Sequence, residues 1–251
     1  MAVVEFEVRG AVRHIRLNRP EKRNALNPAM VSGLMEAFSQ EPAPGERVAL
    51  IEAAGTVFCA GLDLRERDNS AEGIKPLEAM LHAIETYPLP VVAAVQGDAI
   101  AGGNELAMHC DLVVASTTAR FGMSVAQIGL APSWFLCKKL LEIAGPVATR
   151  RILMLGDPLP AQEIYDLGLI SHIATPDEFA GKVDAILSRI GANAPLALKA
   201  IKAVLVRQMT FRDTIDHKDL DEILGRVRTS KDAEEGIAAF MQRRKPNFQE
   251  H

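Results

Sequence analysis

The chain has 251 residues, 48% of them hydrophobic, which is enough for one large domain or a core with a small appendage. Its formal net charge of −4 gives no overall basic field, and this argues against a nucleic-acid-binding protein. The three cysteines, Cys59, Cys110 and Cys137, lack the spacing of metal ligands. We therefore expect no metal site, no disulfide bond and a reducing, cytoplasmic location.

The sequence also argues against a membrane protein. No positively charged start with a following apolar stretch precedes the first predicted strand, so a signal peptide is not expected. The longest apolar runs, such as Val91–Val95, are far too short to cross a bilayer. The last residues, Gln249–His251, do not form a peroxisomal address. We expect a soluble protein with no membrane partner.

Predicted strands and helices alternate over the first hundred residues. Gly10 is expected to turn between the first two strands, and Asn27 is expected to cap the first helix, which begins with proline. Pro88 and Pro90 are expected to end the second helix. The predicted strands are Val3–Val8, Ala11–Leu17, Val48–Ala53 and Val91–Val95, and the predicted helices are Pro28–Phe38 and Pro76–Thr86.

The remainder of the chain is expected to become increasingly helical. Thr229 and Ser230 are candidate caps for the last helix, whose first turn carries Asp232 and Glu234. Alternating strands and helices followed by helices alone indicate an α/β core with a helical C-terminal region. The predicted strands are Leu112–Ala115 and Ile170–Ile173, and the predicted helices are Gly103–His109, Pro132–Ala144, Pro146–Leu155, Ala161–Leu167, Phe179–Ile190, Pro195–Arg207 and Lys231–Arg244.

Two glycine-bearing segments, Phe58–Leu64 and Gly97–Leu106, follow predicted strands and carry the most information on function. Glycine lets a ligand approach the backbone without a side chain in the way. The second segment runs into a predicted helix, whose first N–H groups lack partners within the helix. Two such N–H groups pointing at one place would bind a thioester oxygen as it becomes an enolate. Glu105 lies in the first turn of this helix, close to that place.

Five motifs occur in order along almost the whole chain: Leu17–Leu26 (LNRPEKRNAL), Phe58–Leu64 (FCAGLDL), Gly97–Leu106 (GDAIAGGNEL), Phe121–Gly122 with Gly129 and Pro132, and Ala239–Phe248 (AFMQRRKPNF). One motif would be a weak signal, but five in sequence are specific. Together they resemble the crotonase (enoyl-CoA hydratase/isomerase) superfamily.

The resemblance implies a fold, a substrate class and an assembly. The fold would be an α/β spiral of ββα units over residues 1–190, followed by a C-terminal helical region, 191–251, used for trimerisation. The partner would be an acyl-CoA thioester, with coenzyme A present as part of the substrate and no permanently bound cofactor. The chain would form a homotrimer or a hexamer. Acyl chain length, pathway and direction do not follow from the sequence.

The resemblance also assigns roles to individual residues. Leu62 and Gly102 match the backbone N–H groups of the oxyanion hole, although ordinary turns in an α/β core are the plain alternative. Glu105 matches the first catalytic glutamate, and its alternative role is a solvated carboxylate at a helix N-terminus. The expected substrate- and CoA-binding positions are Asn24, Ala25, Leu26, Ala60, Gly61, Leu64, Gly103, Val125 and Lys245.

Val125 is where the sequence departs from the hydratase pattern. It occupies the position of the second catalytic glutamate, and valine can neither activate water nor deliver a proton. Asp98 is a candidate substitute acid, but an aspartate in a turn more commonly caps its own backbone. Asp63, next to an oxyanion residue, is expected to have a structural role.

Three functions therefore remain open on the sequence. The first, and the one that we expect, is hydration or dehydration of an α,β-unsaturated acyl-CoA by a lyase with Glu105 as the acid–base group; the other two are alternatives. The second is a one-acid reaction of the same family, such as double-bond isomerisation, decarboxylation or thioester hydrolysis. The third is an acyl-CoA-binding subunit without catalysis.

Overall fold

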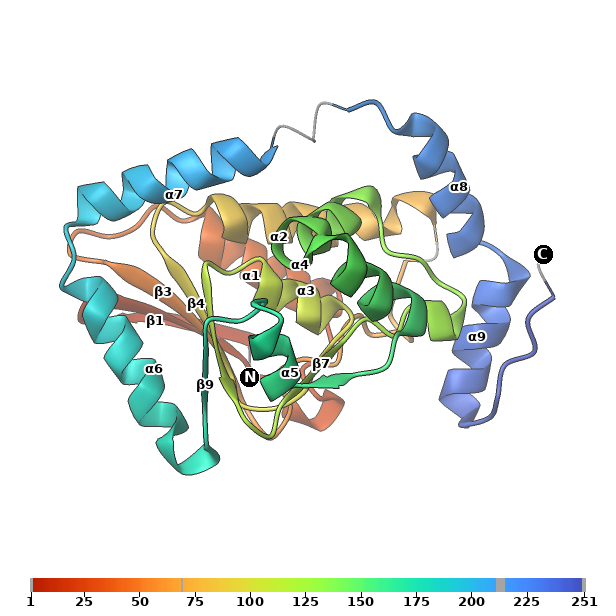
Figure 1. Ribbon diagram of the computed structural model, residues 1–251, viewed down its shortest axis with the longest axis horizontal. Helices are drawn as coiled ribbons and strands as arrows, with labels where there is room; N and C mark the ends of the chain where they lie inside the picture. The colour runs from red at the N-terminus through yellow and green to blue at the C-terminus, as the bar shows by residue number, and fades with distance from the viewer. Residues whose placement is uncertain (1, 69, 211–214, 250–251) are drawn as a thin grey trace.

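The computed structural model describes residues 2–68, 70–210 and 215–249. Its main sheet has six strands in the order β1-β2-β3-β4-β6-β9 (Figure 1). Only β1 and β2 pair antiparallel, since the later strands are joined by helical crossovers. The strands are β1 (Val4–Arg9), β2 (Val12–Leu17), β3 (Val48–Ala53), β4 (Val91–Val95), β6 (Leu112–Ser116) and β9 (His172–Ala174).

A second sheet has three very short strands, β5 (Ala99–Ile100), β7 (Arg120–Gly122) and β8 (Leu159–Pro160). The sequence analysis did not predict it, because strands of two or three residues are too short to show periodicity. The predicted strand at Ile170–Ile173 begins two residues later in the structure, at His172. The small sheet matters for the site, because β5 leads directly into the helix that carries Glu105.

Most predicted helices are present with small changes of boundary. Asn27 caps the first, accepting a hydrogen bond from the Met30 N–H at 2.9 Å, as predicted. The helices are α1 (Pro28–Ser39), α2 (Lys75–Thr86), α3 (Gly102–Met108), α4 (Trp134–Leu155), α5 (Ala161–Asp166), α6 (Pro176–Gly191), α7 (Pro195–Met209), α8 (Lys218–Arg228) and α9 (Lys231–Gln242), with 3-10 turns η1 (Pro20–Lys22), η2 (Ala71–Ile74) and η3 (Ala126–Ile128).

The break inside α4 reflects the two helices predicted there. Gly145 has φ 68° and ψ 172°, outside the helical region, and Pro146 follows it. The two halves of α4 therefore correspond to Pro132–Ala144 and Pro146–Leu155. None of the helices in the described ranges is long and apolar enough to cross a membrane.

Both faces of the main sheet are covered by helices. Strand β4, Val-Val-Ala-Ala-Val, is buried along its whole length, as expected of a central parallel strand. One face packs against α1, α2 and α3 in the larger hydrophobic cluster. The other face packs against α6 in a smaller cluster of Val48, Leu50, Val92, Ala94, Val114, Val183, Leu187 and Ile190.

The C-terminal helices reach opposite ends of the molecule (Figure 1). Helix α7 is attached through buried Lys202, whose ammonium lies 2.6 Å from the Asp111 carboxylate. Helix α9 packs so closely on η3 that a Cβ added to Gly236 would lie 2.4 Å from the Ile128 carbonyl. Arg228 of α8 donates hydrogen bonds to the carbonyls of Asp68 and Ser70. These contacts place α8 and α9 against the loops that surround the site described below.

Gly236 should therefore tolerate no side chain. We expect Gly236→Ala to destabilise the protein by about 1–3 kcal/mol, because the methyl group would overlap the backbone of η3. The control is Gly181→Ala in α6, where an added Cβ meets nothing within 4 Å and alanine should stabilise the helix by up to about 1 kcal/mol. Urea unfolding of both variants measures the difference. Equal stabilities would contradict the close packing of α9 on η3.

Candidate active site

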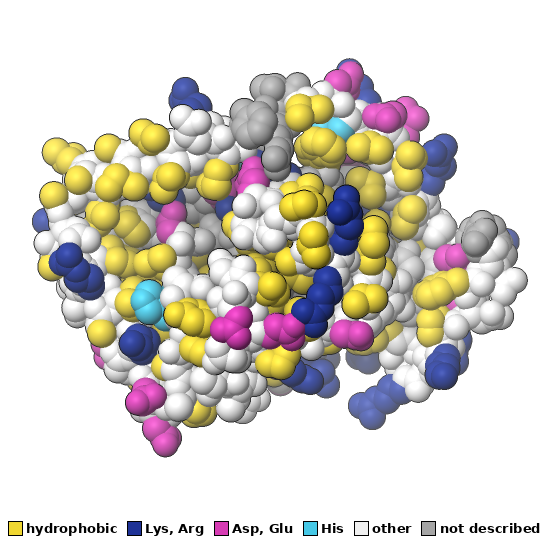
Figure 2. Space-filling view, in the orientation of Figure 1, with side chains coloured by type: hydrophobic (Ala, Val, Ile, Leu, Met, Phe, Trp, Pro, Cys, Tyr) yellow, Lys and Arg dark blue, Asp and Glu magenta, His cyan; other side chains and the backbone are white. Residues whose placement is uncertain are grey.

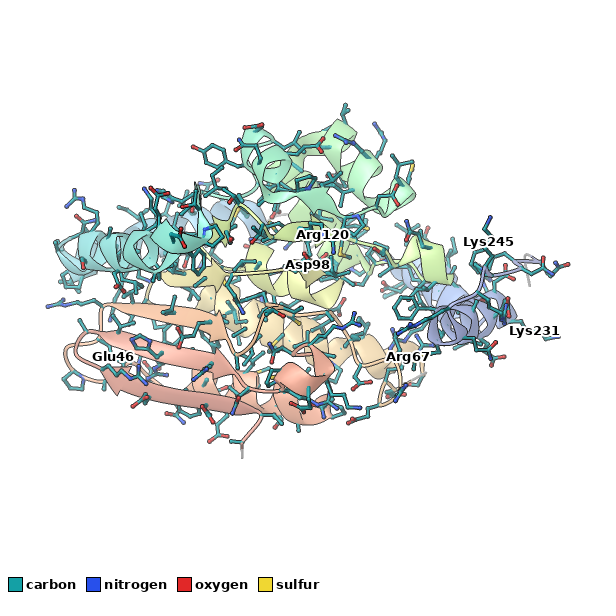
Figure 3. All side chains as sticks on the ribbon, turned by 90° about the horizontal axis from the view of Figure 1, so that it is seen from below. Glu46, Arg67, Asp98, Arg120, Lys231 and Lys245 are labelled. Atoms are coloured by element: carbon teal, nitrogen blue, oxygen red, sulfur yellow. The ribbon has the colours of Figure 1, made fainter. Side chains whose placement is uncertain are left out.

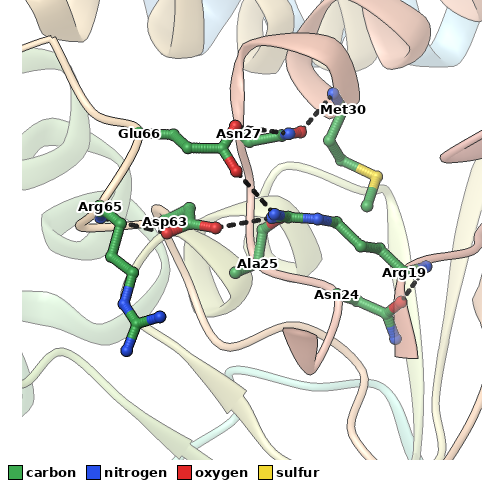
Figure 4. A network of polar contacts seen from close by, with 8 residues as sticks. All are labelled: Arg19, Asn24, Ala25, Asn27, Met30, Asp63, Arg65 and Glu66. Carbon is green, nitrogen blue, oxygen red and sulfur yellow. Dashed lines mark hydrogen bonds and ion pairs between the residues drawn. The ribbon is translucent and has the colours of Figure 1, made fainter. Parts of the chain in front are cut away.

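Arg19 holds the loop that carries Leu62 (Figure 4). Its guanidinium donates to the Asp63 carboxylate at 2.7 Å, to the Ala25 carbonyl at 3.2 Å and to the Glu66 carboxylate at 2.8 Å. Burial alone would raise the pKa of Asp63, but the hydrogen bonds from Arg19 and from the Arg65 N–H hold it below its usual value. Asp63 is therefore engaged in fixing the loop.

Asn24 and Leu26 join the first motif to the same loop. The fully buried Asn24 side chain accepts from the Arg19 N–H at 2.9 Å and donates to the carbonyls of Ala54 and Val57. The Leu26 N–H donates to the Gly61 carbonyl at 2.7 Å, and Leu26 pairs with Leu62 as an isolated parallel bridge. The two segments thus form one unit, although they are more than thirty residues apart.

The peptide groups of Leu62 and Gly102 lie side by side, as the sequence analysis expected. A Cβ built on Gly102 would lie 3.5 Å from the Leu62 nitrogen, and one built on Gly61 would lie 3.1 Å from the Gly102 nitrogen. Neither N–H donates to a backbone carbonyl elsewhere in the part of the chain that the structure describes. Two free donors at adjacent positions can both bind one oxygen atom.

Ala101, just before α3, has a strained backbone. Its φ of 48° and ψ of −117° are unusual for a residue with a side chain. The Ala101 N–H donates to the Gly122 carbonyl at 2.7 Å, so strand β7 helps to hold this conformation. The strain turns the chain sharply into α3, at the residue before the Gly102 N–H.

Leu62 and Gly102 open onto a cavity of about 1580 Å³. Helices α8 and α9 contribute part of its wall, together with η3 and the start of α4. Val125 lines it, half-buried and packed against the hydrophobic core. The apolar part of the lining also includes Met123, Ile128, Leu130, Trp134 and Phe135.

Basic residues also line the cavity: Lys22, Arg23, Arg65, Lys75, Arg120, Arg228, Arg243, Arg244 and Lys245. Arg244 is already engaged with Glu235 through two hydrogen bonds of 2.5 and 2.7 Å. Lys245 lies near the C-terminal end of the molecule (Figure 3). Several cations at a cavity rim can bind a polyanion such as the phosphates of coenzyme A.

The structure divides the predicted binding positions into two sets. Ala25, Ala60, Leu64, Val125 and Lys245 line the cavity, as do the oxyanion candidates Leu62 and Gly102. The other set shapes the backbone around it without being part of the lining: Asn24, Leu26, Gly61 and Gly103. Gly103 is needed for close approach, because a Cβ there would lie 2.1 Å from the Cys59 carbonyl oxygen.

Glu105 lies behind the first turn of α3, fully buried and outside the lining of the cavity. Neither of its carboxyl oxygens has a hydrogen-bond partner among the described residues. Burial raises the pKa of Glu105 to about 8, against the opposing influence of the Lys139 ammonium. Most Glu105 side chains are therefore protonated at neutral pH, and the group is an acid rather than a base there.

His109, one turn further along α3, is also buried. Its Nδ1 lies 2.8 Å from the Glu105 backbone carbonyl and 3.8 Å from the nearer Glu105 carboxyl oxygen. Burial lowers the pKa of His109 to about 4, so the ring is neutral beside a neutral acid. The two side chains can coexist in this apolar place because neither is charged at pH 7.

Asp98 lines the cavity, but its carboxylate accepts hydrogen bonds from Arg120 (Figure 3). The Arg120 side chain donates at 2.6 and 3.1 Å, and its backbone N–H donates at 3.2 Å. These bonds tie the turn before β5 to the start of β7. A carboxylate held by an arginine in this way is poorly suited to exchanging protons with a substrate.

Two pairs of side chains were missed by the sequence analysis. In the cavity lining, Trp134 stacks on His217 with ring centroids 4.8 Å apart, and His217 Nδ1 lies 3.0 Å from the Asp221 carboxylate. Behind α3, Lys139 forms a buried ion pair with Glu85 at 2.6 Å. Each pair joins residues from elements far apart in the sequence, so no local motif signals it.

Comparison with known proteins agrees with the geometry. The sequence matches the enoyl-CoA hydratase/isomerase family over residues 7–251. An enoyl-CoA hydratase of Mycobacterium tuberculosis is 32% identical, with 99% of each chain covered. (E)-benzylidenesuccinyl-CoA hydratase of Thauera aromatica is 30% identical over 98% of each chain.

Among solved structures, methylmalonyl-CoA decarboxylase complexed with 2S-carboxypropyl-CoA superposes with a TM-score of 0.91 at 27% identity, covering 99% of this chain and 98% of that one. An enoyl-CoA hydratase from Mycobacterium avium gives a TM-score of 0.86 at 28% identity, covering 99% of both chains. The predicted α/β fold with C-terminal helices is thereby confirmed. The chain belongs to the enoyl-CoA hydratase/isomerase (crotonase) family, whose members act on CoA thioesters.

Proposed function

We propose that this protein stabilises the enolate of an acyl-CoA thioester in a reaction that needs no second carboxylate. The first candidate is loss of CO₂ from a malonyl-type thioester. The supporting observation is that the free N–H groups of Leu62 and Gly102 open onto a cavity in which Val125 stands at the position of the second glutamate.

Decarboxylation generates an enolate without a general base. The bond between Cα and the carboxylate breaks, CO₂ leaves, and the electron pair passes into the enolate whose oxygen accepts from Leu62 and Gly102. A proton then adds to Cα and gives the saturated thioester. An acid that is protonated at neutral pH suits this last step, and Glu105 has that property. Substrate binding would have to bring Cα within reach of its buried carboxyl group.

Hydration or dehydration of an α,β-unsaturated acyl-CoA is the second candidate. It is favoured by the hydratase names of the relatives from Mycobacterium tuberculosis and Thauera aromatica. Glu105 alone would then have to activate water and also return the proton to Cα. Val125 offers no help, and Asp98 is occupied by Arg120. Isomerisation, thioester hydrolysis and binding without turnover are the remaining alternatives.

We also propose that the chain assembles as a homotrimer or a hexamer. Helix α7 exposes Leu196, Ile201, Val204 and Leu205, each more than half exposed (Figure 2). Val147, Met154 and Leu155 of α4 are likewise exposed. Groups of exposed apolar side chains such as these often mark surfaces that contact another subunit.

A comparison of CoA thioesters tests the reaction. We expect purified protein to convert methylmalonyl-CoA to propionyl-CoA and CO₂, and to hydrate crotonyl-CoA slowly or not at all. Chromatography of the CoA products measures both reactions in one experiment. Fast hydration of crotonyl-CoA, approaching the diffusion limit of about 10⁸ M⁻¹s⁻¹ in kcat/KM, would overturn the one-carboxylate proposal.

Replacing Glu105 tests its role. We expect Glu105→Gln to lower kcat on the active thioester by about a hundredfold or more with little change in KM, because the amide keeps the shape but holds no transferable proton. A kcat within about twofold of wild type would remove Glu105 from the mechanism.

The same variant should change the pH dependence of stability. Unfolded Glu105 loses its proton near pH 4.5, while the folded group keeps it up to about pH 8. The folded state therefore binds more protons in this window, and wild-type stability falls as pH rises through it. Glutamine has no such proton, so Glu105→Gln should gain stability relative to wild type between pH 4.5 and 8. Chemical unfolding of both proteins at several pH values measures this difference in stability and also shows whether the variant is folded.

Restoring the absent carboxylate is the converse experiment. We expect Val125→Glu to raise the rate of crotonyl-CoA hydration by about tenfold or more, since general acid catalysis is worth up to about ten-thousandfold. The gain is limited because a new carboxylate in a half-buried place must be desolvated. Val125→Gln is the matched control, with the same size and no acid. An equal rate in both variants would show that a carboxyl group at this position contributes nothing.

A further inference from the structure

Four titratable side chains lie together behind the oxyanion helix, outside the cavity. Glu105 and His109 come from α3, Glu85 from α2 and Lys139 from α4. The side chains of Glu105 and His109 are completely buried, and those of Glu85 and Lys139 are only 4% and 7% exposed. The Lys139 ammonium lies 2.6 Å from Glu85 Oε1.

The surroundings of Glu105 are closed by aromatic and weakly polar groups. Phe135 of α4 stacks on His109 with centroids 5.1 Å apart, and the Lys138 ammonium lies 5.2 Å from the centre of the Phe135 ring. His82 of α2 meets Phe135 edge-on at 6.4 Å. Burial raises the pKa of Cys137 to about 11, with a further contribution from the charge of Glu105 nearby. Lys139 is the cation among these groups that acts on Glu105.

A buried ion pair at this place is costly in stability. Removing both charges from water is compensated only when all hydrogen-bonding groups are satisfied. Glu85 Oε2 and both oxygens of Glu105 have no hydrogen-bond partner within the described residues. Replacing a buried ion pair by apolar residues of similar volume is often neutral or stabilising. The presence of the pair is therefore weak evidence for a role in stability.

We propose that Lys139 is a positioning residue whose ammonium sets the charge of Glu105, and that Glu85 holds this ammonium in place. The functional meaning rests on the proposed role of Glu105 in proton transfer. The effect of the Lys139 ammonium on the charge of Glu105 does not rest on that role, because it concerns only groups within the folded chain.

Two opposing effects act on the Glu105 carboxyl group. Burial disfavours the charged form of Glu105 and raises its pKa. Lys139 opposes this effect, so that Glu105 can both lose and regain a proton near neutral pH. Glu85 carries the opposite charge and fixes the location of the ammonium through their hydrogen bond. Burial tends to raise the pKa of Glu85, but the charge of Lys139 and its hydrogen bond outweigh burial and hold this pKa below its usual value. Glu85 is therefore a carboxylate, and the pair stays ionic.

The test measures the titration of Glu105 directly, without substrate. Infrared difference spectra across a pH series report the carbonyl band of the protonated acid, and the band that disappears in Glu105→Gln is assigned to Glu105. We expect Lys139→Met to raise the midpoint of this band by about one pH unit, because the opposing charge is gone. Lys139→Arg keeps the charge and should keep the midpoint near that of the wild type.

Two double variants serve as controls for loss of folding and for a general effect of removing a buried ion pair. Lys139→Met leaves Glu85 buried without a partner; if that variant does not fold, Glu85→Gln combined with Lys139→Met removes the stranded charge and should show the same rise. Arg13→Met combined with Glu46→Gln removes another buried ion pair, whose Arg13 Nε lies 3.1 Å from Glu46 Oε2. Glu46 lies at the end of the molecule remote from Lys245 (Figure 3). This control should leave the midpoint unchanged.

The outcomes separate the inference from the proposed function. An unchanged Glu105 midpoint in the folded charge-removing variant, or an equal rise in the Arg13 control, would overturn the role of Lys139. A rise with Lys139→Met but not with Lys139→Arg would support it. If the rise occurs while Glu105→Gln retains full turnover of methylmalonyl-CoA and crotonyl-CoA, the electrostatic inference stands and the proton-transfer role of Glu105 fails.

Discussion

The site depends on the direct contact of two stretches of backbone, residues 59–62 and the first turn of α3. Side chains are excluded between them, since a Cβ on Gly103 would lie 2.1 Å from the Cys59 carbonyl oxygen and one on Gly61 would lie 2.8 Å from the Ile100 carbonyl oxygen. The Arg19 and Asn24 hydrogen bonds hold one stretch, and the small sheet holds the other. The adjacent N–H groups of Leu62 and Gly102 are a consequence of this packing.

The charges around this contact are arranged in two different ways. On the loop side, the hydrogen bonds from the Arg19 guanidinium and the Arg65 N–H lower the pKa of Asp63, which lines the cavity. Behind α3, burial keeps Glu105 and His109 neutral, with the Lys139–Glu85 pair close by. One carboxylate is thus fixed in the loop that carries Leu62, and a titratable one lies in the helix that begins at Gly102. The hydrogen bonds of the first hold the shape of the loop, while the second can change its charge near neutrality.

The strands and helices could largely be predicted from local signals in the sequence, whereas the adjacency of Leu62 and Gly102 was expected from the resemblance to a family. Proline at the start of α1, the apolar run of β4 and the glycines before α3 all act within a few residues of where they stand. The placement of Glu105 outside the cavity could not be predicted, because the direction of a side chain in a short helix depends on what packs against it. Glu85 and Lys139 are 54 residues apart, and only the folding of α2 and α4 around α3 brings them together.

The dense packing of α9 on η3 makes the C-terminal helices part of the cavity wall. Gly236 and Gly129 let the two backbones meet without side chains, and α9 and the residues after it provide part of the cavity wall. The strands of the main sheet, Leu62 and Gly102 all come from parts of the chain that precede α8. A displacement of α8 and α9 would therefore widen the cavity, while the two N–H groups would keep their own supports in the loop at residues 59–62 and the first turn of α3.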